Sequence, residues 1–412
     1  METVRNSQSD DAVFYDAICN DLIDPTSWQD EDGEDKNPNF EIARLKFLLT
    51  LPEYANDEEK KNKLVEWIKN DEMAPYYERV YEELKWKRDK NMLKEMQEAN
   101  KKALESLESE IEYAQNNLGT IDIKVAYVNK AAYLSKIGNK DDTIKTLAQA
   151  YDHTVALGCK LDNVFHCIKI GLFFNDLDLI KRNLSRSEQL IEEGADWHYR
   201  NCFKIYTGLY SLATRDFTTA CDVFTSVIST FVCTELISLS TFIKYTVYSA
   251  MLILKRNDLQ SKIMKNSDIL QALHRDNTLK QYLFSFYNSE FKDFFKALAE
   301  VEIDMRQDAL LHAHYHFYVK EMKIKAYDQL LSTYISLNLS YMADRFGVTE
   351  EYLEEDMTKL IAAKRLNYKI DRVSGNIVNM RSDKRQEMLE NVIKNGDVLL
   401  NRIHKLSRVV NI

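Results

Sequence analysis

The chain has 412 residues, of which 45% are hydrophobic and 29% charged, and its formal net charge is −10. This composition excludes global disorder, and the negative charge argues against a general nucleic-acid or anionic-membrane binder. The longest aliphatic run, about Ala250 to Leu254, is far below the ~20 residues that a membrane-spanning helix needs.

Proline and glycine usage predicts a nearly all-helical protein. All four prolines precede residue 76, and only ten glycines occur in the whole chain. The polar, acidic start is unlike a secretory signal, and six cysteines without a C-x-x-C pair are typical of buried free thiols. We therefore expect a soluble intracellular protein in a reducing compartment.

The first third of the chain divides into two predicted segments. Residues 1–39 contain the acidic run Asp30 to Asp35 and are expected to be a mobile acidic segment. Residues 40–118 carry helical patterns that begin at Phe40 and recur through Leu64. Because no breaker follows Tyr76, the stretch to residue 118 predicts one long rod helix of about 60 Å.

Residues 119–231 show weak internal repetition. Polar breaks near Gly138, Asn175 and Arg215, spaced by roughly 37 and 40 residues, predict stacked helical hairpins of the tetratricopeptide kind. An irregular helical bundle is the alternative. Residues 232–336 continue helically, and their many aromatic side chains are expected to form a core rather than a ligand site.

Residues 337–380 read as a winged helix. Gly347 supplies a tight turn, Thr349 caps the second helix, and a hairpin turns at Ser374-Gly375. That second helix begins with carboxylates where base contacts would be made, so DNA binding is disfavoured and protein contact is favoured. The candidate partner-binding residues of the wing are Tyr368, Ile370 and Ile377.

Residues 381–412 form a predicted closing helix. Apolar residues and one glycine recur there at alternating steps of three and four, which is a heptad seam that favours a partner helix. The seam contains the remaining candidate partner-binding residues: Leu389, Val392, Leu399, Ile403, Leu406 and Val410, with Gly396 between them.

No residue set indicates catalysis, a cofactor or a metal. His312 and His316 would share a helical face at a spacing suited to a metal ion. No acidic or cysteine residue follows them at a sequence spacing typical of a further metal ligand. The phosphate-binding, dinucleotide, zinc-protease and serine-hydrolase motifs are also missing. We expect neither an enzyme nor a small-molecule binder.

Several stretches resemble the PCI domain family, named for the proteasome lid, the COP9 signalosome and translation initiation factor 3. They include L-N-L-S-Y-M-A-D-R-F-G-V (337 to 348), L-I-A-A-K-R-L (360 to 366) and G-D-V-L-L-N-R-I-H-K-L-S-R-V-V-N-I (396 to 412), of which the last is the most specific. The resemblance implies a helical-repeat, TPR-like right-handed superhelix that ends in a winged helix and a bundle-forming C-terminal helix. One departure is Lys364, where such winged helices often carry glycine.

Within the family the chain is most similar to a non-catalytic lid subunit of the proteasome. That resemblance implies a scaffold in ubiquitin-dependent degradation, cytoplasmic and nuclear, whose partners are other PCI and MPN subunits of the lid and possibly the ATPase ring. It implies no nucleic-acid, membrane or small-molecule partner. A paralogous signalosome subunit and a nucleic-acid-binding PCI protein are the alternatives.

Overall fold

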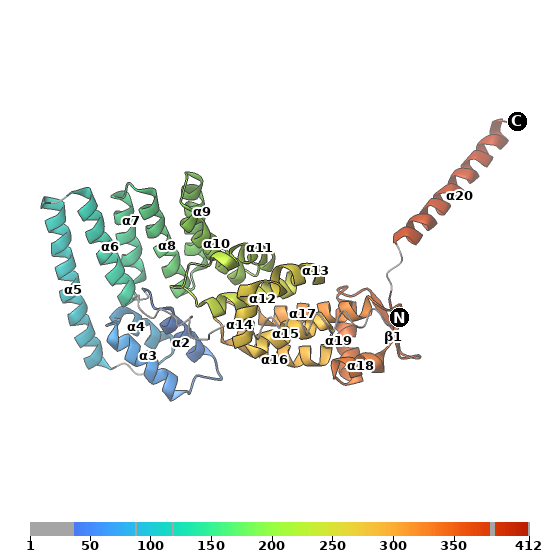
Figure 1. Cartoon of the computed structure of the whole chain (residues 1–412), viewed down its shortest axis with the longest axis horizontal. Coiled ribbons are helices and arrows are strands. Elements are labelled where there is room, and N and C mark those ends of the chain that lie inside the picture. The colour runs from blue at the N-terminus through green and yellow to red at the C-terminus, as the bar shows by residue number, and fades with distance from the viewer. Residues whose placement is uncertain (1–36, 87–88, 118, 380–383, 411–412) are drawn as a thin grey trace. The chain divides into compact units, whose positions relative to one another are not determined.

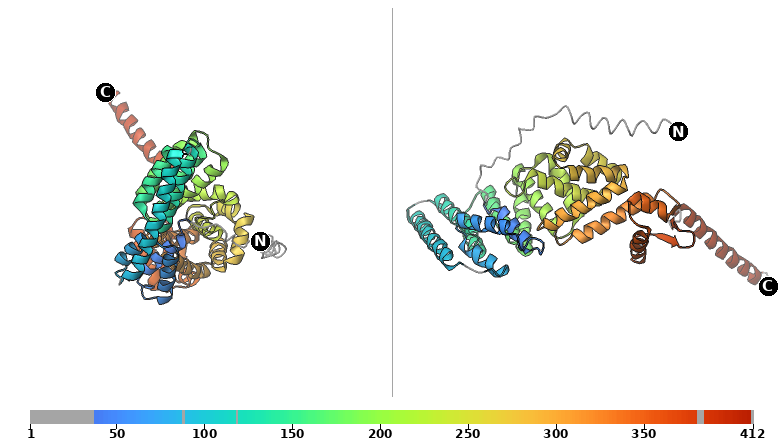
Figure 2. Two further views of the ribbon diagram at one scale, coloured as in Figure 1. Left: turned by 90° about the vertical axis from the view of Figure 1, so that its left-hand side faces the viewer. Right: turned by 90° about the horizontal axis from the view of Figure 1, so that it is seen from below.

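The computed structural model describes residues 37–86, 89–117, 119–379 and 384–410. Within these ranges the chain is helical apart from one small three-stranded sheet, which confirms the predicted fold class. The acidic run of residues 30–35 lies outside the described residues. The views in Figures 1 and 2 show the helices following one another as adjacent hairpins.

The first four described helices share one apolar cluster. They are α2 (Phe40–Thr50), α3 (Glu58–Asn70), α4 (Ala74–Glu83) and α5 (Lys90–Asn117). Side chains of Asn39 and Asp57 cap α2 and α3 by accepting hydrogen bonds from backbone N–H groups of the first turn. Ile42, Leu64 and Tyr77 are fully buried where these helices meet.

The predicted rod over residues 76–118 is wrong, because α4 ends at Glu83 and α5 begins at Lys90. Lys85 adopts a left-handed backbone with φ 55°, and the N–H of Trp86 donates to the carbonyl of Tyr81 at 3.1 Å. The indole then packs edge-on against the Tyr81 ring at 5.4 Å. Burying this aromatic pair outweighs continuing the helix into solvent.

The three predicted breaks lie at the turns of helical hairpins, as the repeat pattern predicts. Gly138, Asn175 and Arg215 all have positive φ, at 77°, 54° and 66°. Each lies between two antiparallel helices that stand side by side in Figure 1. The pairs are α6 (Thr120–Ile137) with α7 (Lys140–Asp152), α8 (Leu157–Phe174) with α9 (Leu177–Glu192), and α10 (Trp197–Ala213) with α11 (Phe217–Val227).

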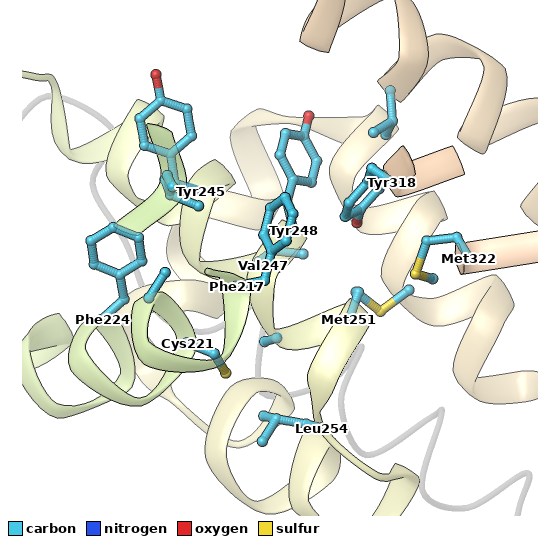
Figure 3. Packing of buried hydrophobic residues seen from close by; sticks show 14 of the residues in the cluster. Phe217, Cys221, Phe224, Tyr245, Val247, Tyr248, Met251, Leu254, Tyr318 and Met322 are labelled. Atoms are coloured by element: carbon cyan, nitrogen blue, oxygen red, sulfur yellow. The ribbon is translucent and has the colours of Figure 1, made fainter. Parts of the chain in front are cut away.

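A second set of helices carries the repeats into the winged helix. It comprises η1 (Ile228–Thr230), α12 (Leu239–Ile253), α13 (Arg256–Leu259), the π-helical turn η2 (Gln260–Met264), α14 (Ser267–Arg275), α15 (Asn277–Asn288), α16 (Phe291–Gln307) and α17 (Tyr315–Leu331). One buried cluster extends without interruption from Leu161 to Ile377. Figure 3 shows part of it, with aromatic rings and methionines from α11, α12 and α17 packed together.

Several buried tyrosine hydroxyls in this core are paired. The hydroxyls of Tyr282 and Tyr318 share a hydrogen bond of 2.8 Å although both residues are fully buried. The hydroxyl of Tyr245 donates to the carboxylate of Asp308 at 2.5 Å. The aromatic-rich segment is therefore a scaffold, as its sequence predicts.

The winged helix is built from two helices and three antiparallel strands. These are β1 (Ser336–Asn338), α18 (Leu339–Phe346), α19 (Glu350–Ala362), β2 (Tyr368–Asp371) and β3 (Asn376–Asn379), with the sheet order β1-β3-β2. Gly347 has φ 67°, and the Thr349 hydroxyl accepts from the N–H of Tyr352 at 3.4 Å, as predicted. The strand β1 is an addition that the sequence analysis missed.

Candidate partner-binding surface

The closing helix α20 (Lys384–Val410) presents an uncovered apolar face. Its predicted seam residues are between 58% and 74% exposed, and they are Leu389, Val392, Leu399, Ile403, Leu406 and Val410. None of the described side chains of this helix is buried against the rest of the chain. Since these residues lie on one side of an α-helix, they form a continuous apolar stripe.

The apolar surface of α20 is wider than the heptad seam. Ile393 and Leu400 lie on one flank of the seam, Val398 and Val409 lie on the other, and all four are more than half exposed. Spacing at 100° per residue places this arc around more than half of the helix circumference. An arc this wide fits a helix surrounded by several neighbours better than a two-stranded coiled coil. Ile393 and Leu400 are seven residues apart, so the sequence held a signal for that flank.

The predicted wing residues occupy a different environment. Tyr368 and Ile377 are buried in the chain's own core, and the Tyr368 hydroxyl donates to Asp328 on α17 at 2.9 Å. Ile370 is half-buried. A partner would therefore meet the backbone edge of β2 or the neighbouring exposed side chains rather than these two. Val373, at the wing tip, is 99% exposed and was missed.

Both outer strands of the sheet are edges. In the order β1-β3-β2, the central strand alone is paired on both sides among the residues that the structure describes. Ile335, 85% exposed, lies next to β1, where its carbonyl accepts from the N–H of Asn379 at 2.9 Å. Open edges beside exposed apolar side chains are suited to strand addition or helix packing by a neighbour.

The acidic side of α19 is solvent-facing and partly neutralised. Glu350, Glu351 and Glu355 are exposed, and the hydrogen bond from Lys359 holds the pKa of Glu355 below its ordinary value. Glu354 pairs with Arg372 of the wing. Exposed carboxylates at the start of the helix repel phosphate, which disfavours contact between this face and a nucleic-acid backbone.

The predicted histidine pair does not assemble into a site. His312 precedes α17 in a turn, so it does not share a helix face with His316. The His312 Nδ1 and the carbonyl of Arg306 lie 2.8 Å apart, as do the His314 Nε2 and the carbonyl of Ala213. Among the described residues no group of three histidines, cysteines or carboxylates is placed to hold a metal ion. The two histidines that contact backbone carbonyls join segments of the fold.

In the described part of the chain, no helix combines the length and the apolar character that crossing a bilayer requires.

Family models match successive parts of this architecture. The model of the PCI domain matches residues 279–381, which contain the last core helices and the winged helix. The model described as 26S proteasome subunit RPN7 matches residues 89–262, and the one described as 26S proteasome regulatory subunit RPN7/PSMD6 C-terminal helix matches residues 390–410. Helical repeats that run into a winged helix thus define a PCI-domain protein.

Curated relatives match nearly the whole chain. The 26S proteasome non-ATPase regulatory subunit 6 of Dictyostelium discoideum is 37% identical over 377 residues, covering 92% of this chain and 98% of the relative. The homologue from Arabidopsis thaliana is 35% identical, covering 92% and 98%. The 26S proteasome regulatory subunit RPN7 of Saccharomyces cerevisiae is 29% identical, covering 95% and 96%. The chain belongs to this family of 26S proteasome regulatory subunits, and the signalosome alternative is not favoured.

Proposed function

We propose that this chain is a non-catalytic scaffold subunit of the lid of the 26S proteasome regulatory particle. It joins other subunits through α20 and the winged helix, and so supports ubiquitin-dependent degradation. The observation that carries this proposal is the uncovered apolar arc of α20, which falls in the segment matched by the family's C-terminal-helix model.

The free energy of burying its apolar side chains favours packing of α20 against partner helices. Fully burying a leucine, valine or isoleucine side chain contributes roughly 1.5–3 kcal/mol. The six seam residues and the four flanking ones are all more than half exposed in the chain alone. Their combined burial gives a strong driving force for packing among partner helices, even after the entropy of association is subtracted.

The chemistry of the most perturbed side chains supports a structural role. Lys325 is half-buried, and its Nζ donates to the carbonyls of Met251 and Leu254 at 2.5 and 2.7 Å, which closes the end of α12. Burial raises the pKa of Asp308, whose carboxylate accepts from the Tyr245 hydroxyl. These groups are held by the chain's own atoms, as expected of a scaffold rather than an enzyme.

The proposed partners are the PCI and MPN subunits of the lid, with the ATPase ring as a further neighbour, and the proposed location is cytoplasmic and nuclear. The test is affinity purification of the tagged full-length chain from its own cells, followed by mass spectrometry. Recovery of proteasomal ATPases and lid subunits is expected. Recovery of cullins and signalosome subunits instead would contradict the proposal.

A matched pair of variants tests the α20 surface itself. Leu399→Glu places a charge at the centre of the seam, whereas Asn401→Glu places the same charge on the opposite face of the same helix. Neither residue packs on the described body of the chain, so circular dichroism should report an unchanged fold for both. We expect Leu399→Glu to weaken incorporation by about 2 kcal/mol or more, because it buries an unpaired charge. Equal incorporation of the two variants would refute the assignment of this face.

A further inference from the structure

Arg402 lies inside the apolar arc of α20. It follows Leu399 by three residues and precedes Leu406 by four, which places it about 60° and about 40° around the helix from these seam residues. Val398 and Val409, on the flank of the arc, lie about 40° and about 20° beyond it. Arg402 therefore leaves the helix between the seam and its flank, with apolar side chains on both sides.

The apolar neighbours of Arg402 are residues that a partner has to cover. Arg402 is exposed, and so are these four neighbours, each by more than half: Val398, Leu399, Leu406 and Val409. Residues three or four positions apart on a helix are adjacent, so a helix that packs on Val398, Leu399 and Leu406 also covers the stem of the arginine. Burial of this part of the arc therefore takes a cation out of water.

The helix itself supplies no counter-charge for Arg402. Of the four positions three or four residues away, three are apolar and the fourth is Lys405, a second cation. Asp397, the carboxylate nearest in the sequence, lies about 140° around the helix from the arginine. When the arc is covered, the charge of Arg402 must therefore be met by the covering helix or left unpaired.

The chemistry of the guanidinium group decides what can meet it. Arginine remains charged at physiological pH, and an ion that is buried without a partner is strongly destabilising. A carboxylate satisfies the guanidinium with two parallel N–H···O hydrogen bonds and neutralises its charge. The backbone carbonyls of a partner helix are already bonded within that helix. An aspartate or glutamate is therefore the side chain that fits opposite this position.

A second polar residue continues the line of Arg402 along the arc. Asn395 lies seven residues before it, about 20° around the helix, and is exposed. One asparagine in an otherwise apolar helical interface fixes the register of the helices, because a shifted partner leaves the amide unpaired. These two polar side chains, two turns apart, each require a polar group from the neighbour that covers them.

We propose that Arg402 selects one neighbour of α20, a partner helix that carries an aspartate or glutamate within its own apolar face and pairs it with the guanidinium inside the covered arc. The inference rests on the proposed function, because it identifies the chemistry of one partner of the same surface. A helix with an apolar residue at that point leaves the arginine unpaired and is rejected. Apolar burial thus supplies the affinity of α20, and the Arg402 pair supplies its discrimination between helices.

Competition for assembly measures the contribution of Arg402. Each tagged full-length variant is expressed beside the untagged wild-type chain, and the ratio of the two is measured by mass spectrometry in purified 26S proteasomes and in the total extract. Arg402→Glu and Arg408→Glu make the same change of charge, but Arg408 lies about 180° around the helix from Leu399. We expect Arg402→Glu to be depleted from proteasomes by at least about tenfold, and Arg408→Glu to enter normally. Arg402→Leu should also enter poorly, because it leaves the partner's carboxylate unpaired.

Zero-length cross-linking identifies the carboxylate itself. Arg402→Lys retains the positive charge and is expected to assemble, and it places at this position an amine that a water-soluble carbodiimide joins to a carboxylate in contact with it. Proteasomes that contain this variant are treated, digested and mapped by mass spectrometry, with Arg408→Lys as the matched control. We expect a peptide that joins position 402, and not position 408, to an aspartate or glutamate in an apolar helical segment of another subunit.

The outcomes separate this inference from the proposed function. If Leu399→Glu is excluded from proteasomes while Arg402→Glu and Arg402→Leu enter as well as Arg408→Glu, the arc is covered but the carboxylate partner is refuted. Absence of an intersubunit cross-link at position 402 in assembled Arg402→Lys would also overturn the inference. If Leu399→Glu and Arg402→Glu both assembled like the wild type, the proposed role of α20 would fail together with it.

Discussion

Gly208, in the middle of α10, lies against the ring of Phe224 on α11. A Cβ atom built on this glycine would come within 2.3 Å of the nearest ring carbon. Phe224 is fully buried, and its ring meets Phe242 edge-on with centroids 5.2 Å apart. The ring therefore has no free space behind it into which it can retreat.

Gly208→Ala should destabilise the chain although alanine is the better helix former. Replacing a helical glycine by alanine ordinarily gains about 1 kcal/mol. Overpacking a dense core costs typically ~1–3 kcal/mol, and a contact this short lies at the upper end of that range. We expect a net loss of about 1–2 kcal/mol, measured by urea unfolding and located to α10 and α11 by hydrogen exchange.

Two further variants separate packing from helix propensity. Gly396→Ala on α20 meets nothing within 4 Å, so it should cause no loss of stability. Adding Phe224→Leu to Gly208→Ala should cost less than the sum of the two single changes, because the smaller side chain makes room for the methyl group. A Gly208→Ala variant as stable as the wild type would refute the packing argument.

Three other changes test the fold elsewhere. Burial lowers the pKa of His166 from 6.5 to about 4, so the unfolded chain binds more protons than the folded chain between these pH values. The free energy of unfolding should therefore fall by about 2 kcal/mol from about pH 7 to about pH 5. Urea unfolding of His166→Gln should lack this loss. Lys325→Met leaves the carbonyls at the end of α12 without their donor and should cost about 2–3 kcal/mol in urea unfolding, whereas Lys320→Met on the exposed side of α17 should cost little. Lys364→Gly relieves a left-handed backbone with φ 56° and should raise the melting temperature, with a gain of about 1 kcal/mol.

The hairpin boundaries could be predicted because their chemistry is local. Glycine at 138 and asparagine at 175 tolerate a left-handed backbone, and each is followed by a side chain that caps the next helix. The same holds for Gly347 and Thr349 in the winged helix. A few adjacent residues determine such turns, so their pattern is readable without knowledge of the fold.

The boundary between α4 and α5 depends on contacts between residues on different helices, so it could not be predicted from the local sequence. Lys85 has no intrinsic preference for the left-handed backbone that it adopts. What fixes it is Trp86, whose ring packs on Tyr81 and lies under Lys61 of α3. Likewise β1 has only three residues, and its strand character comes from pairing with β3, about forty residues later.

The candidate site divides in the same way. The seam of α20 is an unbroken heptad pattern, so its apolar residues were predicted from spacing alone and stand exposed as a surface. In the wing, the alternation of a strand places Tyr368 and Ile370 on one face of the sheet and the residues between and beside them on the other. It does not reveal which face the chain's own helices cover. Tyr368 is covered because α17 supplies Asp328 as its partner.

The regular heptad pattern of α20 is explained by the absence of packing between this helix and the rest of the described chain. Helices of the repeats pack against several unlike neighbours, so their buried positions are irregular, whereas α20 buries none of its described side chains. A helix that packs on nothing is held by its intrinsic helix propensity alone, and such isolated helices are only marginally stable in water. Gly396 lowers that propensity in the middle of α20. In the proposed assembly, most of its stability comes from the surface that covers its apolar arc. Folding of α20 and its association would then be a single thermodynamic event, and the heptad pattern would reflect partner helices rather than this chain's own core.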